Sequence, residues 1–204
     1  MKTIEQIKNL RFIALLFMAV AVVSCSDDDE APEEENLPEV FTNVTLIFTP
    51  TGGGTAITAE AEDPDGEGLD DLEVKDEINL AANTMYTLTF NVENRLDPDA
   101  DLNAEILDED NEHQIFFAFT NDAFTSPMGD GNLGAGRADD DINYSDMDED
   151  GNPVGLVSSW TTGAAQTGAS FQVNLQHQPG AKTADSDSTD GDTDFNLTFV
   201  LNIQ

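Results

Sequence analysis

Apolar and polar residues alternate along most of the chain beyond residue 40. An antiparallel strand with one face in a hydrophobic core and the other in water has this pattern, because successive side chains point to opposite faces. The alternation is clearest in six segments: 44–49, 57–62, 86–92, 115–119, 171–176 and 195–203. We therefore predict an all-β fold.

Weaker alternation in three further segments completes the predicted architecture. With residues 72–80, 142–147 and 156–161 added, the chain offers about eight short strands separated by turn residues. Such a series is typical of an antiparallel, Ig-like β-sandwich.

One short helix is predicted between two of these strands. Asp97 is placed to cap its N-terminus, Pro98 suits the first helical position, and the helix should end near Asp108. Leu102 and Ile106 lie one turn apart, so we expect both to pack on the sandwich.

The first 24 residues have the organisation of a secretory signal peptide. Residues 1–11 contain three of the seven basic residues of the chain, and residues 12–23 are all apolar. An apolar helix of that length spans about 18 Å, too short for a hydrocarbon core of about 30 Å. Residues 22–25, Val-Val-Ser-Cys, resemble the bacterial lipobox. The resemblance implies cleavage before Cys25 and acylation of that cysteine, for example with palmitate; the alternative is an ordinary signal peptide with a coincidental cysteine.

An acidic segment follows the cysteine directly. Its first five residues resemble the export signal of Bacteroidota surface lipoproteins: Ser26, Asp27, Asp28, Asp29 and Glu30. The resemblance implies transfer to the cell surface, and a solvated acidic spacer is the alternative. Residues 26–39 contain eight acidic residues and two prolines, so we predict an extended tether. The expected organisation is a cleaved signal peptide (1–24), a lipidated cysteine with its tether (25–39) and a β-sandwich domain (40–204).

Charge and cysteine content exclude several classes of protein. The 204 residues include 42 acidic and only 7 basic ones, for a net charge of −35. A nucleic-acid binder is excluded, because nothing here could neutralise a phosphate backbone. The single cysteine excludes a disulfide scaffold and a cysteine-rich zinc module.

The best candidate for Ca²⁺ binding is the acidic loop at residues 146–152. Asp146, Asp148 and Asp150 occupy positions 1, 3 and 5 of an EF-type loop, with glycine at position 6 and Asn152 at position 7. Position 12 is Val157, where an EF-hand needs a glutamate, so this would be a calcium loop within a β-hairpin. The alternative is an acidic hairpin turn without a metal ion.

Two other acidic segments are weaker candidates for cation binding. Residues 63–68 form a good turn sequence without any metal, and residues 185–194 are best interpreted as a surface loop. Within the latter, Asp187-Ser188-Thr189 resembles the O-glycosylation site of Bacteroidota proteins.

The two histidines suggest a transition-metal site. His113 opens one predicted strand and His177 closes another, so antiparallel strands in one sheet, or facing strands, would bring both imidazoles to the same end. Together with Asp110 or Glu112 they could hold Zn²⁺, Cu²⁺ or iron. In the alternative, each histidine simply ends a strand beside neighbouring carboxylates.

Catalysis finds little support in the sequence, and we expect no enzymatic activity. Lipidation would consume Cys25, and the nucleophile-elbow, zinc-protease and phosphate-loop motifs are missing. Trp160 is interpreted as a core residue, with an exposed sugar platform as the alternative.

Several segments together resemble a group of small acidic Bacteroidota surface lipoproteins: 63–66, 80–88, 112–117, 151–156 and 175–179. The resemblance implies a lipoprotein, anchored in the outer membrane at the cell surface, that serves nutrient or metal uptake. The clustered carboxylates and the two histidines suggest that it binds a cation or small ligand. The expected partner is a TonB-dependent transporter, and a periplasm-facing position is the alternative. Other functions left open are a Ca²⁺-stabilised structural or adhesive module, a protein with the type 1 periplasmic binding fold assigned to some members, and a glycan-active protein.

Overall fold

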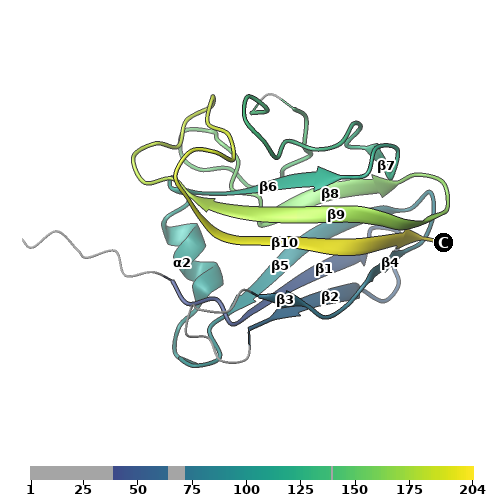
Figure 1. Ribbon diagram of the computed structural model, residues 1–204, viewed down its shortest axis with the longest axis horizontal. Helices are drawn as coiled ribbons and strands as arrows, with labels where there is room; N and C mark the ends of the chain where they lie inside the picture. The colour runs from purple at the N-terminus through teal and green to yellow at the C-terminus, as the bar shows by residue number, and fades with distance from the viewer. Residues whose placement is uncertain (1–38, 64–71, 139) are drawn as a thin grey trace, which may run out of the picture. The chain divides into compact units, whose positions relative to one another are not determined.

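Two β-sheets face each other in the computed structural model, which describes residues 39–63, 72–138 and 140–204. The predicted all-β sandwich with one short helix is confirmed over these residues (Figure 1). The predicted signal peptide, Cys25 and the export signal at 26–30 lie outside the described residues. No helix among the described residues is long and apolar enough to cross a membrane.

The larger sheet has the strand order β3-β2-β1-β5-β8-β7, and the smaller one β4-β10-β9-β6. The strands of the larger sheet are β1 (Asn43–Pro50), β2 (Ile57–Glu62), β3 (Glu73–Val74), β5 (Met85–Glu93), β7 (Phe124–Ser126) and β8 (Val157–Thr162). Those of the smaller sheet are β4 (Ile78–Leu80), β6 (His113–Phe119), β9 (Gln166–His177) and β10 (Asp192–Ile203). Neighbouring strands are antiparallel except β4 and β10, which are parallel.

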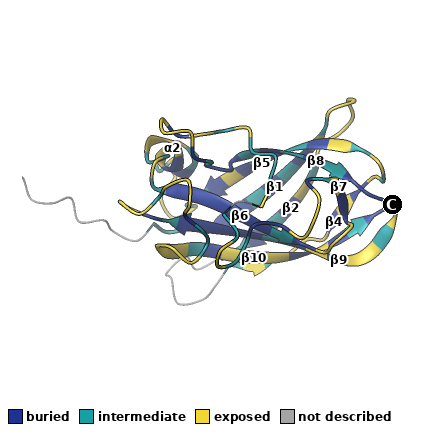
Figure 2. Ribbon diagram, turned by 90° about the horizontal axis from the view of Figure 1, so that it is seen from above, coloured by how far each residue is buried: buried dark blue, intermediate teal, exposed yellow. Residues whose placement is uncertain are grey.

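The core fills the space between the sheets with the apolar face of each strand. Figure 2 shows buried and exposed residues alternating along β10, as the period of two predicts. Trp160 is fully buried, and its ring lies 5.1 Å from that of Phe117 and 5.0 Å from that of Phe171. Its indole N–H donates to the hydroxyl of Ser158, so the ring is a core residue and no sugar platform.

Two of the weaker strand predictions need correction. Residues 72–80 do not form one strand, because the exposed charged residues 75–77 separate β3 from β4, which belong to different sheets. Residues 142–147 form only isolated bridges to the chain opposite. Two backbone hydrogen bonds join residues 143 and 145 to β8, and side chains add to them: the amide of Asn143 donates to the carbonyl of Ser159, and the hydroxyl of Tyr144 donates to the carbonyl of Ile115.

Helix α2 (Leu102–Asp108) ends where the sequence predicts but begins later. Its N-cap is Asp101, whose carboxylate accepts the N–H of Ala104 at 3.1 Å, and not Asp97. Both aspartates can cap, but the backbone from residue 94 to 100 forms turns and delays the helix. Leu102 and Ile106 are buried as predicted. The short turn after α2 leads directly into β6 and so fixes where His113 lies.

Candidate metal centre

The structure brings the two histidines into contact. His113 begins β6, His177 ends β9, and the two residues are direct partners in this antiparallel pair. Their rings stack with centroids 4.4 Å apart and planes inclined by only 5°. This end of the sandwich also carries α2 and the start of β10 (Figure 1).

The Nε2 atom of His113 faces two carboxylates in the protein interior. It lies 3.7 Å from Oε1 of Glu39 and 3.7 Å from Oδ2 of Asp194, and the imidazole is fully buried. Three buried atoms in this group have no hydrogen-bond partner: Oε2 of Glu39, Nε2 of His113 and Oδ2 of Asp194. Buried polar atoms without partners are costly and uncommon, so they indicate a missing ligand or a shared proton.

A β-bulge turns Asp194 toward this group. In the pairing of β10 with β9, Thr193 is opposite Gln176 and Phe195 is opposite Leu175, which leaves Asp194 without a partner. A bulge of this kind redirects a side chain, and bulges are common beside functional sites. Asp194 is therefore aimed inward although Asp192 before it is exposed.

The other edge of the His113 ring fixes its tautomer. Nδ1 lies 3.3 Å from the backbone carbonyl of Glu109, which can only accept a hydrogen bond. Nδ1 therefore carries the hydrogen, and the lone pair of Nε2 points at Glu39 and Asp194. A backbone carbonyl that holds the second nitrogen is the usual support of a metal-binding histidine.

Carboxylates from the turn after α2 surround His177. Its Nε2 lies 3.3 Å from Oε2 of Glu112 and 3.9 Å from Oε2 of Glu109. Asp110, which the sequence offers as the alternative ligand to Glu112, belongs to neither carboxylate–histidine group. Its backbone carbonyl instead accepts a hydrogen bond from the ammonium of Lys182. Among the described residues, two groups bring three ligand atoms within 4.8 Å of one another: Glu109, His113, His177 and Glu39, His113, Asp194.

Burial sets the protonation of the inner group. Burial, and then the neighbouring charge of His177, lowers the pKa of His113 to about 4, so the imidazole is neutral at pH 7. Burial raises the pKa of Glu39 to about 8, and the charge of Asp194 adds to this shift. Burial likewise raises the pKa of Asp194 to about 6. A neutral imidazole beside carboxylates that resist ionisation is an environment that a divalent cation would relieve.

Comparison of the chain with models of protein families, with curated proteins and with solved structures gives no match. The assignment of a site therefore rests on the geometry of this chain.

Sequence reasoning missed Glu39, Glu109 and Asp194 as partners of the histidines. Glu109 could have been predicted from the sequence, because it lies four residues before His113, between the predicted helix and the predicted strand. Glu39 and Asp194 carry no local signal. Glu39 lies far from both histidines in the sequence, and the orientation of Asp194 depends on a bulge that the alternating pattern does not reveal.

The predicted calcium loop uses its carboxylates internally. Asp146 accepts the backbone N–H groups of Gly155 and Val157, both at 3.1 Å. Asp148 accepts the N–H of Asn152 at 2.7 Å and lies 3.2 Å from the ammonium of Lys182. Although these residues are described, the three aspartates of the loop do not gather their oxygens within 4.8 Å of one another. Calcium binding there stays a prediction without geometric support.

The other acidic segments offer less. Residues 64–68 lie outside the described residues. In the loop before β10, Asp187 accepts hydrogen bonds from Thr189 and from the N–H of Gly136. The hydroxyl of Ser188 accepts the N–H of Gly134, and glycosylation of this tripeptide stays a prediction.

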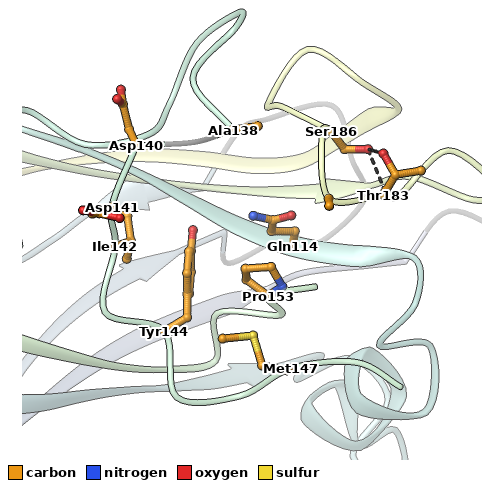
Figure 3. Close-up of a pocket in the computed structure, with 11 residues that line it drawn as sticks. Gln114, Ala138, Asp140, Asp141, Ile142, Tyr144, Met147, Pro153, Thr183 and Ser186 are labelled. Atoms are coloured by element: carbon orange, nitrogen blue, oxygen red, sulfur yellow. Dashed lines mark hydrogen bonds between the residues drawn. The ribbon is translucent and has the colours of Figure 1, made fainter. Parts of the chain in front are cut away.

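A polar groove of about 190 Å³ lies on the opposite face of β6 (Figure 3). Gln114, Thr183 and Ser186 contribute polar groups to it, and Tyr144 and Met147 form an apolar wall. Gln114 follows His113 in the strand, so the two side chains point to opposite faces. The groove is thus separate from the histidine cluster.

Gly191 holds the backbone close to His177, and we expect its replacement to disturb the cluster. A Cβ atom at this position would lie 2.1 Å from the carbonyl oxygen of His177, and φ is +80°. Gly191→Ala should lower the free energy of unfolding by about 2–4 kcal/mol, from backbone strain together with the clash. Gly180→Ala, with φ of +64° and open space around it, should cost only about 1 kcal/mol. Urea unfolding followed by the fluorescence of Trp160 measures both, and equal costs would contradict the close approach.

Proposed function

We propose that this chain is a non-enzymatic, lipid-anchored surface protein that binds a divalent transition-metal ion in the histidine cluster and serves metal or nutrient uptake. One observation carries the proposal. The lone pair of a fully buried imidazole, at Nε2 of His113, is directed at two carboxylates, with Oε1 of Glu39 and Oδ2 of Asp194 each 3.7 Å away. Nε2, Oδ2 of Asp194 and the second carboxylate oxygen of Glu39, Oε2, are buried atoms without a hydrogen-bond partner.

The separations suit a metal ion. Ligand atoms about 2.1 Å from a tetrahedral Zn²⁺ lie about 3.4 Å from one another. The separations of 3.7 Å around Nε2 would need to shrink by only a few tenths of an ångström. One imidazole and two carboxylates match Zn²⁺, Fe²⁺ and Cu²⁺ better than Ca²⁺, which prefers six or more oxygens.

The balance of charges also supports a divalent metal ion at the inner group. Two ionised carboxylates and a neutral imidazole would offset the charge of a divalent cation, so an ion at this place would neutralise both carboxylates. The rest of the proposal depends on the N-terminal resemblances, which suggest a lipid on Cys25 and a position beside an outer-membrane transporter. Recovery of a TonB-dependent transporter together with the chain from detergent-solubilised outer membranes would support that part.

A calorimetric titration tests the metal site. The full-length chain, purified in detergent and stripped with a chelator, is titrated with Zn²⁺ in excess Mg²⁺, which occupies the acidic surface. We expect tight binding that Asp194→Asn weakens by at least about tenfold, because the loss of one ligand removes a charged donor. Asp185→Asn, which removes an exposed carboxylate from the preceding loop, should bind as the native chain does. Equal affinity in the two variants, with both still folded, would refute the site.

A further inference from the structure

The histidine cluster has a second side, which faces the surface. Nε2 of His177 lies 3.3 Å from Glu112 and 3.9 Å from Glu109, on the edge of the His113 ring opposite Glu39 and Asp194. We propose that His177 and Glu112, with Glu109 beside them, form an outer metal position that takes up a divalent transition-metal ion first and passes it to the inner position at Nε2 of His113. This inference rests on the proposed function, because it supplies the route to the inner site.

The stacked rings favour two positions over one. A nitrogen lone pair lies in the plane of its imidazole, and the two planes are nearly parallel. Parallel rings cannot direct their lone pairs at one ion unless one ring turns. In addition, Nδ1 of His113 already donates to the carbonyl of Glu109. The geometry therefore favours one ion at each histidine over the single shared site that the sequence predicts.

Exposure orders the two positions. The side chains of the inner group are 0%, 9% and 15% exposed for His113, Glu39 and Asp194. Those of His177, Glu112 and Glu109 are 12%, 31% and 45% exposed. A hydrated ion thus meets the outer carboxylates before it can lose its water and reach the inner group.

The outer ligands are held in place by the backbone. The N–H of Gln178, directly after His177, donates to the carbonyl of Glu112 at 2.6 Å. The N–H of Glu112 donates in turn to the carbonyl of Glu109 at 2.9 Å. These two bonds join the end of β9 to the turn after α2, so the backbone holds all three residues near one another.

Glu109 connects the two positions. Its Oε2 lies 3.9 Å from Nδ1 of His113 and 3.9 Å from Nε2 of His177. Its charge also acts on both inner carboxyls, Glu39 and Asp194. Glu109 therefore places negative charge beside both histidine rings.

Cobalt is a suitable probe, because the visible absorption of Co²⁺ reports its ligands. The stripped full-length chain in detergent is titrated with Co²⁺ in excess Mg²⁺, and loading is followed by stopped flow. We expect one tight and one weaker equivalent. His177→Ala should remove the weaker equivalent and slow the loading of the tight one by about tenfold, since the outer charges no longer capture the ion. Glu112→Gln should act in the same direction, and Glu149→Gln, at an exposed loop position, should change neither.

The inner variant separates this inference from the proposed function. Asp194→Asn should remove the tight equivalent and leave the weaker one. The outer position alone would be overturned by two results together: the native chain binds no weaker equivalent of Co²⁺, and the His177→Ala variant takes up the tight equivalent at the native rate. Absence of any tight equivalent in the native chain would overturn the proposed function and this inference with it.

Discussion

Replacement of Glu39 by Gln should stabilise the metal-free chain at pH 9 and at the same time weaken its binding of Zn²⁺. Glu39 is a buried carboxyl beside Asp194, and ionisation there places two negative charges together without a counterion. A glutamine has nearly the same shape, carries no charge and can donate a hydrogen bond to Asp194. It removes the repulsion but also removes a ligand from the proposed inner metal position.

The direction of the pH dependence follows from the raised pKa. Burial, with Asp194 adding to it, raises the pKa of Glu39 in the folded chain from 4.5 to about 8. The folded state then binds a proton more tightly than the unfolded state does. The stabilisation is fully present below pH 4.5 and is lost as the pH rises through 8, by about 1.4 kcal/mol for each pKa unit. Glu39→Gln should abolish this decline and exceed the native chain in stability by about 2–4 kcal/mol at pH 9.

Urea unfolding at pH 5, 7 and 9 in the presence of a chelator measures the effect. Glu149→Gln, a change at an exposed glutamate, should follow the native chain at each pH. Addition of Zn²⁺ should reverse the order, because an ion that binds only the folded native chain stabilises that chain alone. A Glu39→Gln variant that is less stable than the native chain at pH 9 would contradict the prediction, because the ionised carboxylate of Glu39 would then have favourable partners in the folded chain.

His113 acts in the opposite direction at low pH. Its pKa is lowered from 6.5 to about 4, chiefly by burial, so the unfolded state binds a proton more readily in this range. The neutral imidazole stabilises the fold fully above pH 6.5, and this contribution is lost as the pH falls through 4. The same acid-side decline should therefore remain in Glu39→Gln.

The strands with one buried face could be predicted from the sequence, because the alternation of apolar and polar residues indicates directly which side chains are buried. Segments such as 171–176 and 195–203 became the central strands β9 and β10. Residues 142–147 carry a similar pattern, yet they form only isolated bridges, which side-chain hydrogen bonds from Asn143 and Tyr144 supplement. The start of α2 was misplaced because two aspartates four residues apart have equal capping chemistry.

The candidate site was only partly predictable. The placement of His113 and His177 at strand ends follows from the strand pattern, and their contact requires only that β6 and β9 be neighbours in register. The inner carboxylates depend on long-range packing and on the bulge at Asp194, and neither leaves a local trace. The geometry of the predicted calcium loop gives no support for Ca²⁺ for a similar reason. Its central carboxylate, Asp148, faces a lysine from a loop that is distant in the sequence.

That lysine, Lys182, connects the acidic loop at 146–152 to the start of β6. Its side chain is fully buried, its ammonium lies 3.2 Å from the buried carboxylate of Asp148, and it donates to the backbone carbonyl of His113 at 2.9 Å. Burial lowers the pKa of Lys182, and Asp148 opposes this shift. The ammonium thus provides, from within the chain, a positive charge for the acidic loop in which the sequence suggested Ca²⁺.

Removal of this charge should be among the most damaging single changes in the domain. Lys182→Met keeps the length of the side chain but leaves Asp148 buried without its counterion, so we expect a loss of about 3–5 kcal/mol in the free energy of unfolding. Lys75→Met removes an exposed ion pair with Glu73, at 2.6 Å, and should cost far less, because water screens that pair. In the double variant, Asp148→Asn should recover part of the loss, because the uncompensated charge disappears with it. Similar costs for Lys182→Met and Lys75→Met would contradict this prediction, because the buried pair would then contribute no more than a surface pair.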